Sequence, residues 1–144
     1  MRIIPVLMIV LLSGCSFTNT YVNRASDQKS GVELTRKFYQ YTKEKDLDKV
    51  FSIFNLGERA DDIADKKEKI KTLLSGVSEN LGEVTSLELL TNHTKVIEGN
   101  KVTGEYKIVF KVKRSDRPSF FKESFTLYSE NGKIKIADYF INPI

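Results

Sequence analysis

Two carboxylates and one histidine are the side chains in this sequence best suited to chemistry. In the strand pairing derived below, Glu123 and Asp138 are diagonal neighbours on adjacent strands of an otherwise apolar sheet face. Carboxylates in an apolar hollow repel each other and resist ionisation, which raises at least one pKa, as general acid–base catalysis requires. His93, the only histidine, is expected opposite Tyr106 near the open end of that face. Asp138, Glu123 and His93 are therefore the catalytic candidates.

A structural role for the same residues stays open. A β-bulge would turn Glu123 outward, and Asp138 would then bond a helix terminus or pair with a lysine. A lone histidine is commonly a hydrogen-bonded filler. With one histidine and one cysteine in the chain, a transition-metal ligand set is not expected. No Gly-rich phosphate loop and no nucleophile elbow occur. We expect no metal and no cofactor.

The opposite face of the predicted sheet is rich in lysine. Lys111 and Lys122 are expected to face each other directly, which is unfavourable unless an anion lies between them. Such a surface suits an acidic partner protein or anionic lipid headgroups, and a simply solvated lysine face is the alternative. The residues assigned to this surface are Lys107, Lys111, Lys113, Lys122, Lys133, Lys135 and Tyr139.

These positions follow from four strands expected after Val84, where hydrophobic periodicity changes from helical to alternating. Gly99-Asn100 and Asn131-Gly132 are favoured two-residue hairpin turns, and Ser115-Asp116-Arg117-Pro118 suits a four-residue loop. These connections determine the register, and the register places the apolar residues on one face. The predicted pairs include Leu89 with Phe110, Thr91 with Ile108, His93 with Tyr106, Phe110 with Glu123, Leu127 with Ile136, Phe125 with Asp138, and Glu123 with Phe140.

Three helices are expected before the sheet. Ser30 and Glu33 fit a capping box that begins the first, and Asp46 begins the second. The third is expected to end at Gly82. Because the apolar sheet face needs a cover, the predicted fold is α+β: N-terminal helices packed in the hollow of a curved four-stranded antiparallel meander.

In element order, and in the helix–Asp46–helix beginning, residues 31–144 resemble the nuclear-transport-factor-2-like superfamily. The resemblance implies helices packed into a curved sheet. Its members include ketosteroid isomerases, dehydratases, protein-binding modules and bacterial lipoproteins, so the fold does not choose among these functions. The resemblance also implies that the chain could form a homodimer through the outer face of the sheet. The facing side chains of Lys111 and Lys122 disfavour such a dimer.

The amino terminus has the pattern of an export signal. Arg2 precedes the apolar residues 3–12, and Leu12-Ser13-Gly14-Cys15 resembles the lipobox of bacterial lipoproteins. The resemblance implies diacylglyceryl attachment to the Cys15 thiol, cleavage before Cys15 and acylation of the new amino terminus. Ser16 in place of aspartate favours the outer membrane, facing the periplasm, in a host with two membranes. We expect a signal peptide over 1–14, the lipidated cysteine and a flexible tether over 15–30, and one domain over 31–144.

The function predicted from these observations is a lipid-anchored, non-enzymatic binding or interaction domain of the bacterial cell envelope. The membrane is the expected partner through the N-terminal lipid, and an envelope protein or a small apolar ligand would bind the domain. A net charge of +4 is too small to indicate nucleic-acid binding. Two alternatives stay open: an isomerase- or dehydratase-like enzyme using acids in the sheet hollow, and an accessory subunit of an envelope secretion or transport assembly.

Overall fold

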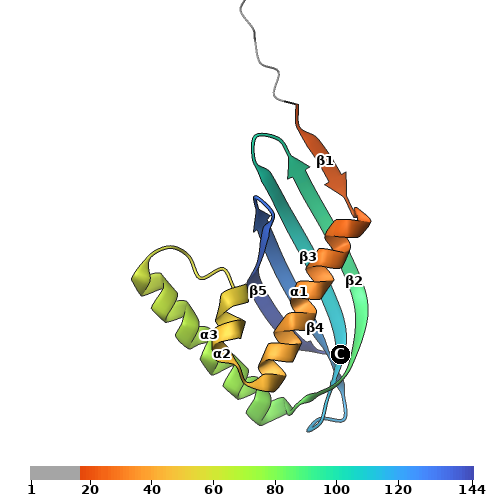
Figure 1. Ribbon diagram of the computed structural model, residues 1–144. Helices are drawn as coiled ribbons and strands as arrows, with labels where there is room; N and C mark the ends of the chain where they lie inside the picture. Colours follow the sequence, from red (N-terminus) through yellow and green to blue (C-terminus); the bar gives the residue numbers. More distant parts are fainter. Residues whose placement is uncertain (1–16) are drawn as a thin grey trace, which may run out of the picture.

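A computed structural model describes residues 17–144 of the chain (Figure 1). Its helices and strands are, in chain order, β1 (Asn19–Val22), α1 (Ala25–Glu44), α2 (Leu47–Ile53), α3 (Ala60–Leu81), β2 (Val84–Glu98), β3 (Val102–Arg114), β4 (Phe120–Glu130) and β5 (Lys133–Pro143). The strands form one antiparallel sheet in the order β1-β2-β3-β4-β5. The α+β class is confirmed, with five strands where four were expected.

The additional strand comes from residues that the sequence suggested were a tether. Tyr21 of β1 pairs with Val96 of β2, and the Arg24 guanidinium lies 4.2 Å from the centre of the Tyr21 ring. Arg24 also binds Glu98 at 2.8 Å, which ties the start of α1 to the end of β2. These contacts give a polar segment enough partners to fold against the edge of β2. The ordered part of the chain therefore begins before residue 31.

Two of the three predicted helix signals are confirmed. The Asp46 carboxylate accepts the Lys49 backbone N–H at 3.1 Å and begins α2, and Gly82 ends α3 with φ +75°. The capping box at Ser30 is wrong, because α1 begins at Ala25. The Ser30 hydroxyl donates instead to the Ser26 carbonyl one turn back, as a serine inside a helix does.

Helix α1 crosses one face of the sheet and carries the centre of the core. Phe38 is buried, and its ring lies 5.2 Å from that of Phe125 and 4.8 Å from that of Tyr139. Gly31 allows the crossing to be close, since a Cβ there would lie 2.9 Å from Ile108 Cδ1. The sheet face beneath α1 buries a row of apolar side chains: Val96, Tyr106, Ile108, Phe110, Val112, Phe121, Phe125, Leu127 and Ile136.

The register is as predicted between β3 and β4, and it departs from the prediction in the other two hairpins. Glu98 pairs with Val102, so the first turn has three residues, 99–101, and not two. A bulge between Leu89 and Thr91 compensates, so Leu89 still pairs with Phe110 while His93 faces Lys107. The Asn131-Gly132 turn is confirmed, and Leu127 pairs with Ile136. A second bulge beyond that pair shifts the rest of β5 by one residue.

Helix α3 packs far less tightly than α1. None of its residues is buried, although Ile63, Ile70, Leu74 and Val77 form a half-buried stripe facing the rest of the fold. Its C-terminal end is fixed by the Arg114 guanidinium, which donates to the Gly82 carbonyl at 3.0 Å. In the described part of the chain, no helix has the length and apolarity to cross a membrane.

Candidate functional site

The structure separates the three catalytic candidates. Glu123 is fully buried beneath α1. Asp138 pairs with Thr126 and is exposed, because the β5 bulge turns its side chain to the opposite face of the sheet. His93 is exposed for the corresponding reason, the bulge in β2. The predicted acid pair therefore does not form.

Glu123 lies instead at the centre of a buried polar cluster with Arg114, Tyr39 and Tyr139. The Arg114 Nε donates to Glu123 Oε1 at 2.8 Å, and its Nη2 lies 2.8 Å from the same oxygen. The tyrosine hydroxyls donate to Oε2, Tyr39 at 2.9 Å and Tyr139 at 2.6 Å. The Arg114 side chain is 7% exposed and that of Glu123 is 0% exposed, so the charges compensate each other out of contact with water.

Burial and the Glu123 carboxylate control the protonation of both tyrosines. Desolvation raises the pKa of Tyr39 far above its usual range, and the neighbouring negative charge of Glu123 raises it further. The pKa of Tyr139 is raised well above 10.0 by the same two causes in the same order. Each hydroxyl therefore remains a neutral donor to Glu123 at physiological pH.

A cleft of about 670 Å³ opens beside this cluster, between the C-terminal halves of α1 and α3 and the start of β2. Arg114, Tyr39 and Tyr139 contribute to its lining, next to Phe38 and Leu87. The apolar stripe of α3 supplies the opposite wall through Leu74 and Val77. Lys43, Lys45, Glu79 and Glu83 also line the cleft. Its volume is typical of small-molecule sites, which are mostly apolar with a few fixed polar groups.

The hydrogen-bond pattern limits what this cleft can do chemically. Both oxygens of Glu123 already accept hydrogen bonds. The Arg114 guanidinium donates to Glu123, to the Gly82 carbonyl and to the Tyr139 hydroxyl. A general base needs a free lone pair directed at the substrate proton. Glu123 has none directed into the cleft, so the cluster is suited to holding the wall of the cleft in place.

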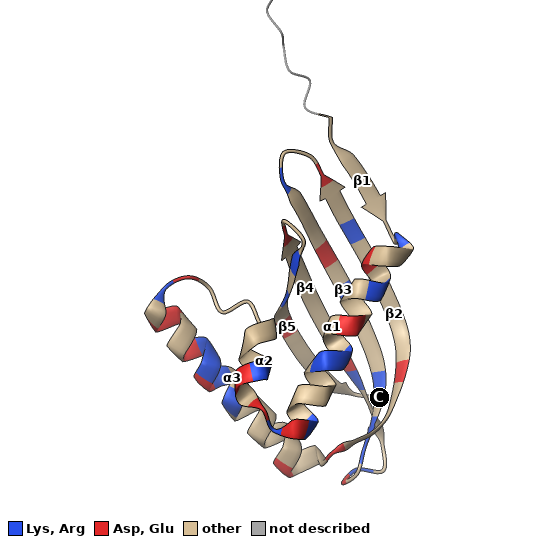
Figure 2. Ribbon diagram, viewed as in Figure 1, with Lys and Arg blue, Asp and Glu red and all other residues tan. Residues whose placement is uncertain are grey.

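The outer sheet face carries the predicted lysines, but acidic neighbours pair with two of them. Lys107 Nζ lies 3.3 Å from Glu105, and Lys111 Nζ lies 3.8 Å from Glu88. Lys111 faces Lys122, as predicted. Lys113 Nζ lies 5.2 Å from the centre of the Phe120 ring. Figure 2 shows the two signs of charge interspersed over the strands. Tyr139 does not belong to this surface, because the β5 bulge turns it into the core.

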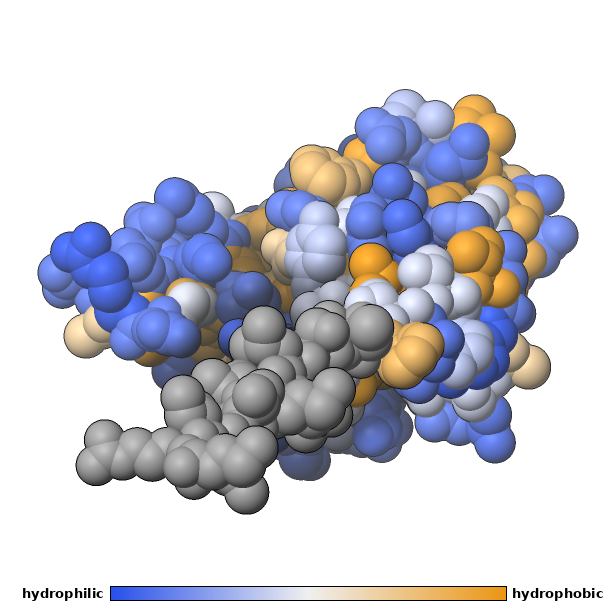
Figure 3. Space-filling model, turned by 90° about the horizontal axis from the view of Figure 1, so that it is seen from above, coloured by the Kyte–Doolittle hydropathy of each residue, from blue (hydrophilic) through white to orange (hydrophobic). Residues whose placement is uncertain are grey.

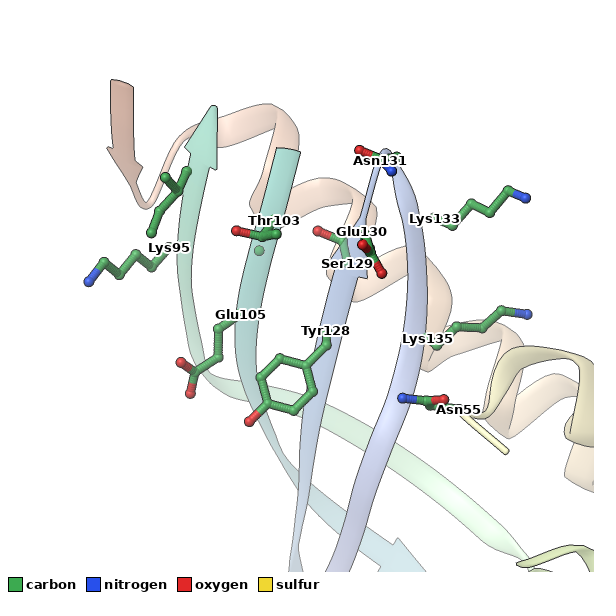
Figure 4. Close-up of a pocket in the computed structure, with 12 residues that line it drawn as sticks. Asn55, Lys95, Thr103, Glu105, Tyr128, Ser129, Glu130, Asn131, Lys133 and Lys135 are labelled. Carbon is green, nitrogen blue, oxygen red and sulfur yellow. The ribbon is translucent and has the colours of Figure 1, made fainter. Parts of the chain in front are cut away.

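An open hollow of about 840 Å³ lies on the outer face near the β2–β3 and β4–β5 turns. In Figure 4, Lys95 extends from β2 on one side, Lys133 and Lys135 extend from β5 on the other, and Tyr128 and Glu105 lie between them. The Lys135 ammonium donates to the Ser52 carbonyl of α2. This hollow is more open to solvent than the cleft beside α3.

Sequence reasoning missed Arg114 and Tyr39 as members of the buried cluster. The alternation along β3 does contain the signal for Arg114, because residues 110, 112 and 114 share a face. Tyr39 directly follows the core residue Phe38 on α1, and no pattern distinguishes it from an ordinary core aromatic. Tyr139 was assigned to the wrong face because nothing in the sequence marks the bulge.

Among residues 17–144, no group of three His, Cys, Asp or Glu side chains is arranged to hold a metal ion. The lipobox at 12–15, the signal peptide at 1–14 and the lipidation site at Cys15 lie outside the described residues. No family model, curated protein or solved structure matches the chain.

Proposed function

We propose that this protein is a lipid-anchored, non-enzymatic binding domain of the bacterial cell envelope, and that a small apolar ligand occupies the cleft between α1, α3 and the sheet. The anchor rests on Leu12-Ser13-Gly14-Cys15 and the apolar residues before it. The observation that supports the binding role is the cleft itself, which has apolar side chains on two facing walls and charged side chains beside them. The polar cluster that borders it uses both oxygens of Glu123 in internal hydrogen bonds.

The geometry favours binding over the isomerase- or dehydratase-like alternative. That alternative needs two acids in one hollow, and Asp138 lies on the other face of the sheet from Glu123. The resemblance to the nuclear-transport-factor-2-like superfamily agrees with helices covering one face of an antiparallel sheet, and it includes binding modules as well as enzymes. The role as accessory subunit of an envelope assembly has no specific observation in its favour.

Adjacent leucines on α3 provide the test of the cleft. Leu74 lines it, whereas Leu73 is 44% exposed and does not. We expect the full-length protein to bind a fluorescent fatty-acid probe in a titration. Leu74→Asp should weaken that binding at least about tenfold, since a charge would enter an apolar site. The matched Leu73→Asp variant should bind as the wild type does.

Equal binding by the two variants would place the probe elsewhere and contradict the cleft as its site. A separate measurement tests the anchor: the intact mass of the protein isolated from membranes shows whether it carries acyl chains. Wild-type protein should carry acyl chains, and Cys15→Ser should carry none.

A further inference from the structure

We propose that one end of the sheet rests on an anionic lipid surface, with its lysines contacting the headgroup phosphates. This turn end consists of residues 17–19, the β2–β3 turn at 99–101 and the β4–β5 turn at 131–132, together with the adjoining hollow lined by Lys95, Lys133 and Lys135. The inference rests on the proposed lipid anchor at Cys15. It adds a second contact with the membrane, made by the lysines, and this contact orients the domain with its turn end toward the bilayer.

The first support is the length of chain between the anchor and the fold. Strand β1 begins at Asn19, four residues after Cys15. At about 3.3–3.6 Å per residue, that stretch reaches no more than about 14 Å. Asn19 pairs with Glu98, and Thr18 lies beside Gly99, where an added Cβ would be 3.3 Å from the threonine hydroxyl. A lipid on Cys15 therefore holds the β2–β3 turn close to the bilayer surface.

The second support is an exposed aromatic ring at the same place. Phe17 is 86% exposed and lies two residues from Cys15 in the chain. A single exposed apolar side chain needs no explanation elsewhere on a surface. At this position its ring is within reach of the boundary between headgroups and acyl chains, where aromatic side chains bury favourably.

The third support is the charge that remains at the turn end after its ion pairs are formed. Glu98 binds Arg24 at 2.8 Å, Glu130 lies 3.5 Å from Lys101, and Glu105 lies 3.3 Å from Lys107. The two lysines compensate Glu130 and Glu105, whereas Arg24 is shared between Glu98 and Asp27, which it binds at 2.8 Å each.

Three lysines lining the hollow, Lys95, Lys133 and Lys135, have no ion pair among the described residues. Figure 3, which looks onto this end of the molecule, shows mainly hydrophilic side chains with hydrophobic ones in separate small groups. Uncompensated lysines close to a bilayer are attracted to anionic headgroups.

An anionic bilayer suits the hollow better than an acidic protein does, because the bilayer is already in place. The hollow is open, lysines line it, and it lies at the same end of the sheet as Asn19, four residues after the anchor, so lipid phosphates are the nearest anions at high local concentration. The resulting orientation leaves the cleft beside α3 at the far end of the sheet, directed away from the lipid.

Depth measurements on the reconstituted full-length lipoprotein test the orientation. A nitroxide is attached at Asn100→Cys in the β2–β3 turn or at Ser119→Cys in the β3–β4 loop, both exposed. Vesicles contain phosphatidylcholine alone or with added phosphatidylglycerol. With phosphatidylglycerol, we expect the label at 100 to gain contact with oxygen dissolved in the bilayer and to lose contact with a water-soluble nickel complex. The label at 119 should remain in water.

Charge reversal separates the lysines from the anchor. Each lysine near an anionic surface contributes roughly fivefold to the equilibrium, so Lys95→Glu/Lys133→Glu should lower the bilayer-contacting population by more than about twentyfold. High salt should do the same. The protein should still float with the vesicles. The matched control Lys71→Glu/Lys122→Glu makes the same change in net charge away from the turn end and should leave both labels unaffected.

Three outcomes overturn the inference. If the label at 100 stays in water while the acylated protein floats, the anchor stands and the orientation is wrong. If the isolated protein carries no acyl chains, both the anchor and the orientation fail. If poly-glutamate protects the label at 100 from nickel and phosphatidylglycerol vesicles do not, the hollow belongs to an acidic protein partner.

Discussion

The Glu123 carboxylate carries its charge where water does not reach, and three side chains hold it there. Removing one partner of such a group costs more than the bond itself, because the remaining polar atoms stay buried without a partner. The cluster also joins three parts of the fold, since Tyr39 comes from α1, Tyr139 from β5, and Arg114 reaches the end of α3 at Gly82. At the scale of single residues, the cluster therefore determines how the helices sit on the sheet.

Substitution of either buried tyrosine should destabilise the protein in a pH-dependent way. Tyr39→Phe or Tyr139→Phe removes a hydrogen bond to a charged group, which we expect to lower the free energy of unfolding by about 1.5–3 kcal/mol at neutral pH. Urea unfolding measures it. Tyr128→Phe is the control, because Tyr128 is 47% exposed, and should change stability little.

The sign of the alkaline effect follows from the raised pKa values of both tyrosines. Above about pH 10 the unfolded state releases the tyrosine protons, whereas the folded state keeps them. The contribution of the two tyrosines to the free energy of unfolding is therefore complete below about pH 10 and declines as the pH rises further. Loss of one buried tyrosine should make that decline shallower by about 1.4 kcal/mol per pH unit. An unchanged slope in Tyr39→Phe would show that its hydroxyl ionises normally in the fold.

At the scale of elements, the close crossing of α1 over β3 explains much of the core geometry. The contact depends on Gly31, because a Cβ there would lie 2.9 Å from Ile108 and 3.0 Å from Tyr106. Both of those side chains are buried and have little room to move. Gly76, in the middle of α3, has nothing within 4 Å of the equivalent position.

The two glycines should respond oppositely to the same substitution. Gly31→Ala is expected to cost about 1–3 kcal/mol through overpacking, despite the better helix propensity of alanine. Gly76→Ala should instead stabilise the protein by about 0.5–1 kcal/mol. Thermal or urea unfolding of the paired variants tests this. Stabilisation by both substitutions would mean that α1 lies farther from the sheet than the structure places it.

Much of the sheet was predictable because its turns have specific sequences. The errors in register trace to two bulges and to the β2–β3 turn, which has three residues where two were predicted. The loop at 115–118 predicted the β3–β4 register correctly, and Asn131-Gly132 predicted the β4–β5 register as far as the pair of Leu127 with Ile136. A bulge needs one extra residue, and Leu90 and Ala137 carry no composition that marks them as extra. Because side chains alternate, each slip moved Asp138, Tyr139 or His93 to the wrong face. The helix signals at Asp46 and Gly82 were reliable because capping is local.

At the scale of the whole molecule, helix α3 is held by hydrogen bonds at its two ends and has no buried residue between them. The Arg114–Gly82 bond and the Asp116 N–H to Leu81 carbonyl bond fix the C-terminal end of α3, and Lys66 reaches the Asn55 carbonyl near its start. Between these points α3 buries no residue and borders the cleft. Regions with few buried apolar contacts open locally at low cost in free energy.

Amide hydrogen exchange should reveal this difference between helices. We expect the amides of residues 67–76 in α3 to exchange on the order of a hundredfold or more faster than those of residues 31–40 in α1, because α3 buries no residue and its opening exposes less apolar surface. Mass spectrometry of exchanged peptides from the full-length protein gives both rates at once. Equal protection of the two helices would contradict a loosely packed α3.

The place of β1 in the sheet has a mechanical consequence. Asn19 pairs with Glu98 at the turn end, and β1 runs from there antiparallel to β2. A pull on the amino terminus therefore acts along the strand axis and loads the hydrogen bonds of all four residues of β1 in shear. Bonds loaded together yield at a higher force than bonds peeled apart one at a time. Strand β1 therefore protects the domain against unfolding by a force applied at the amino terminus.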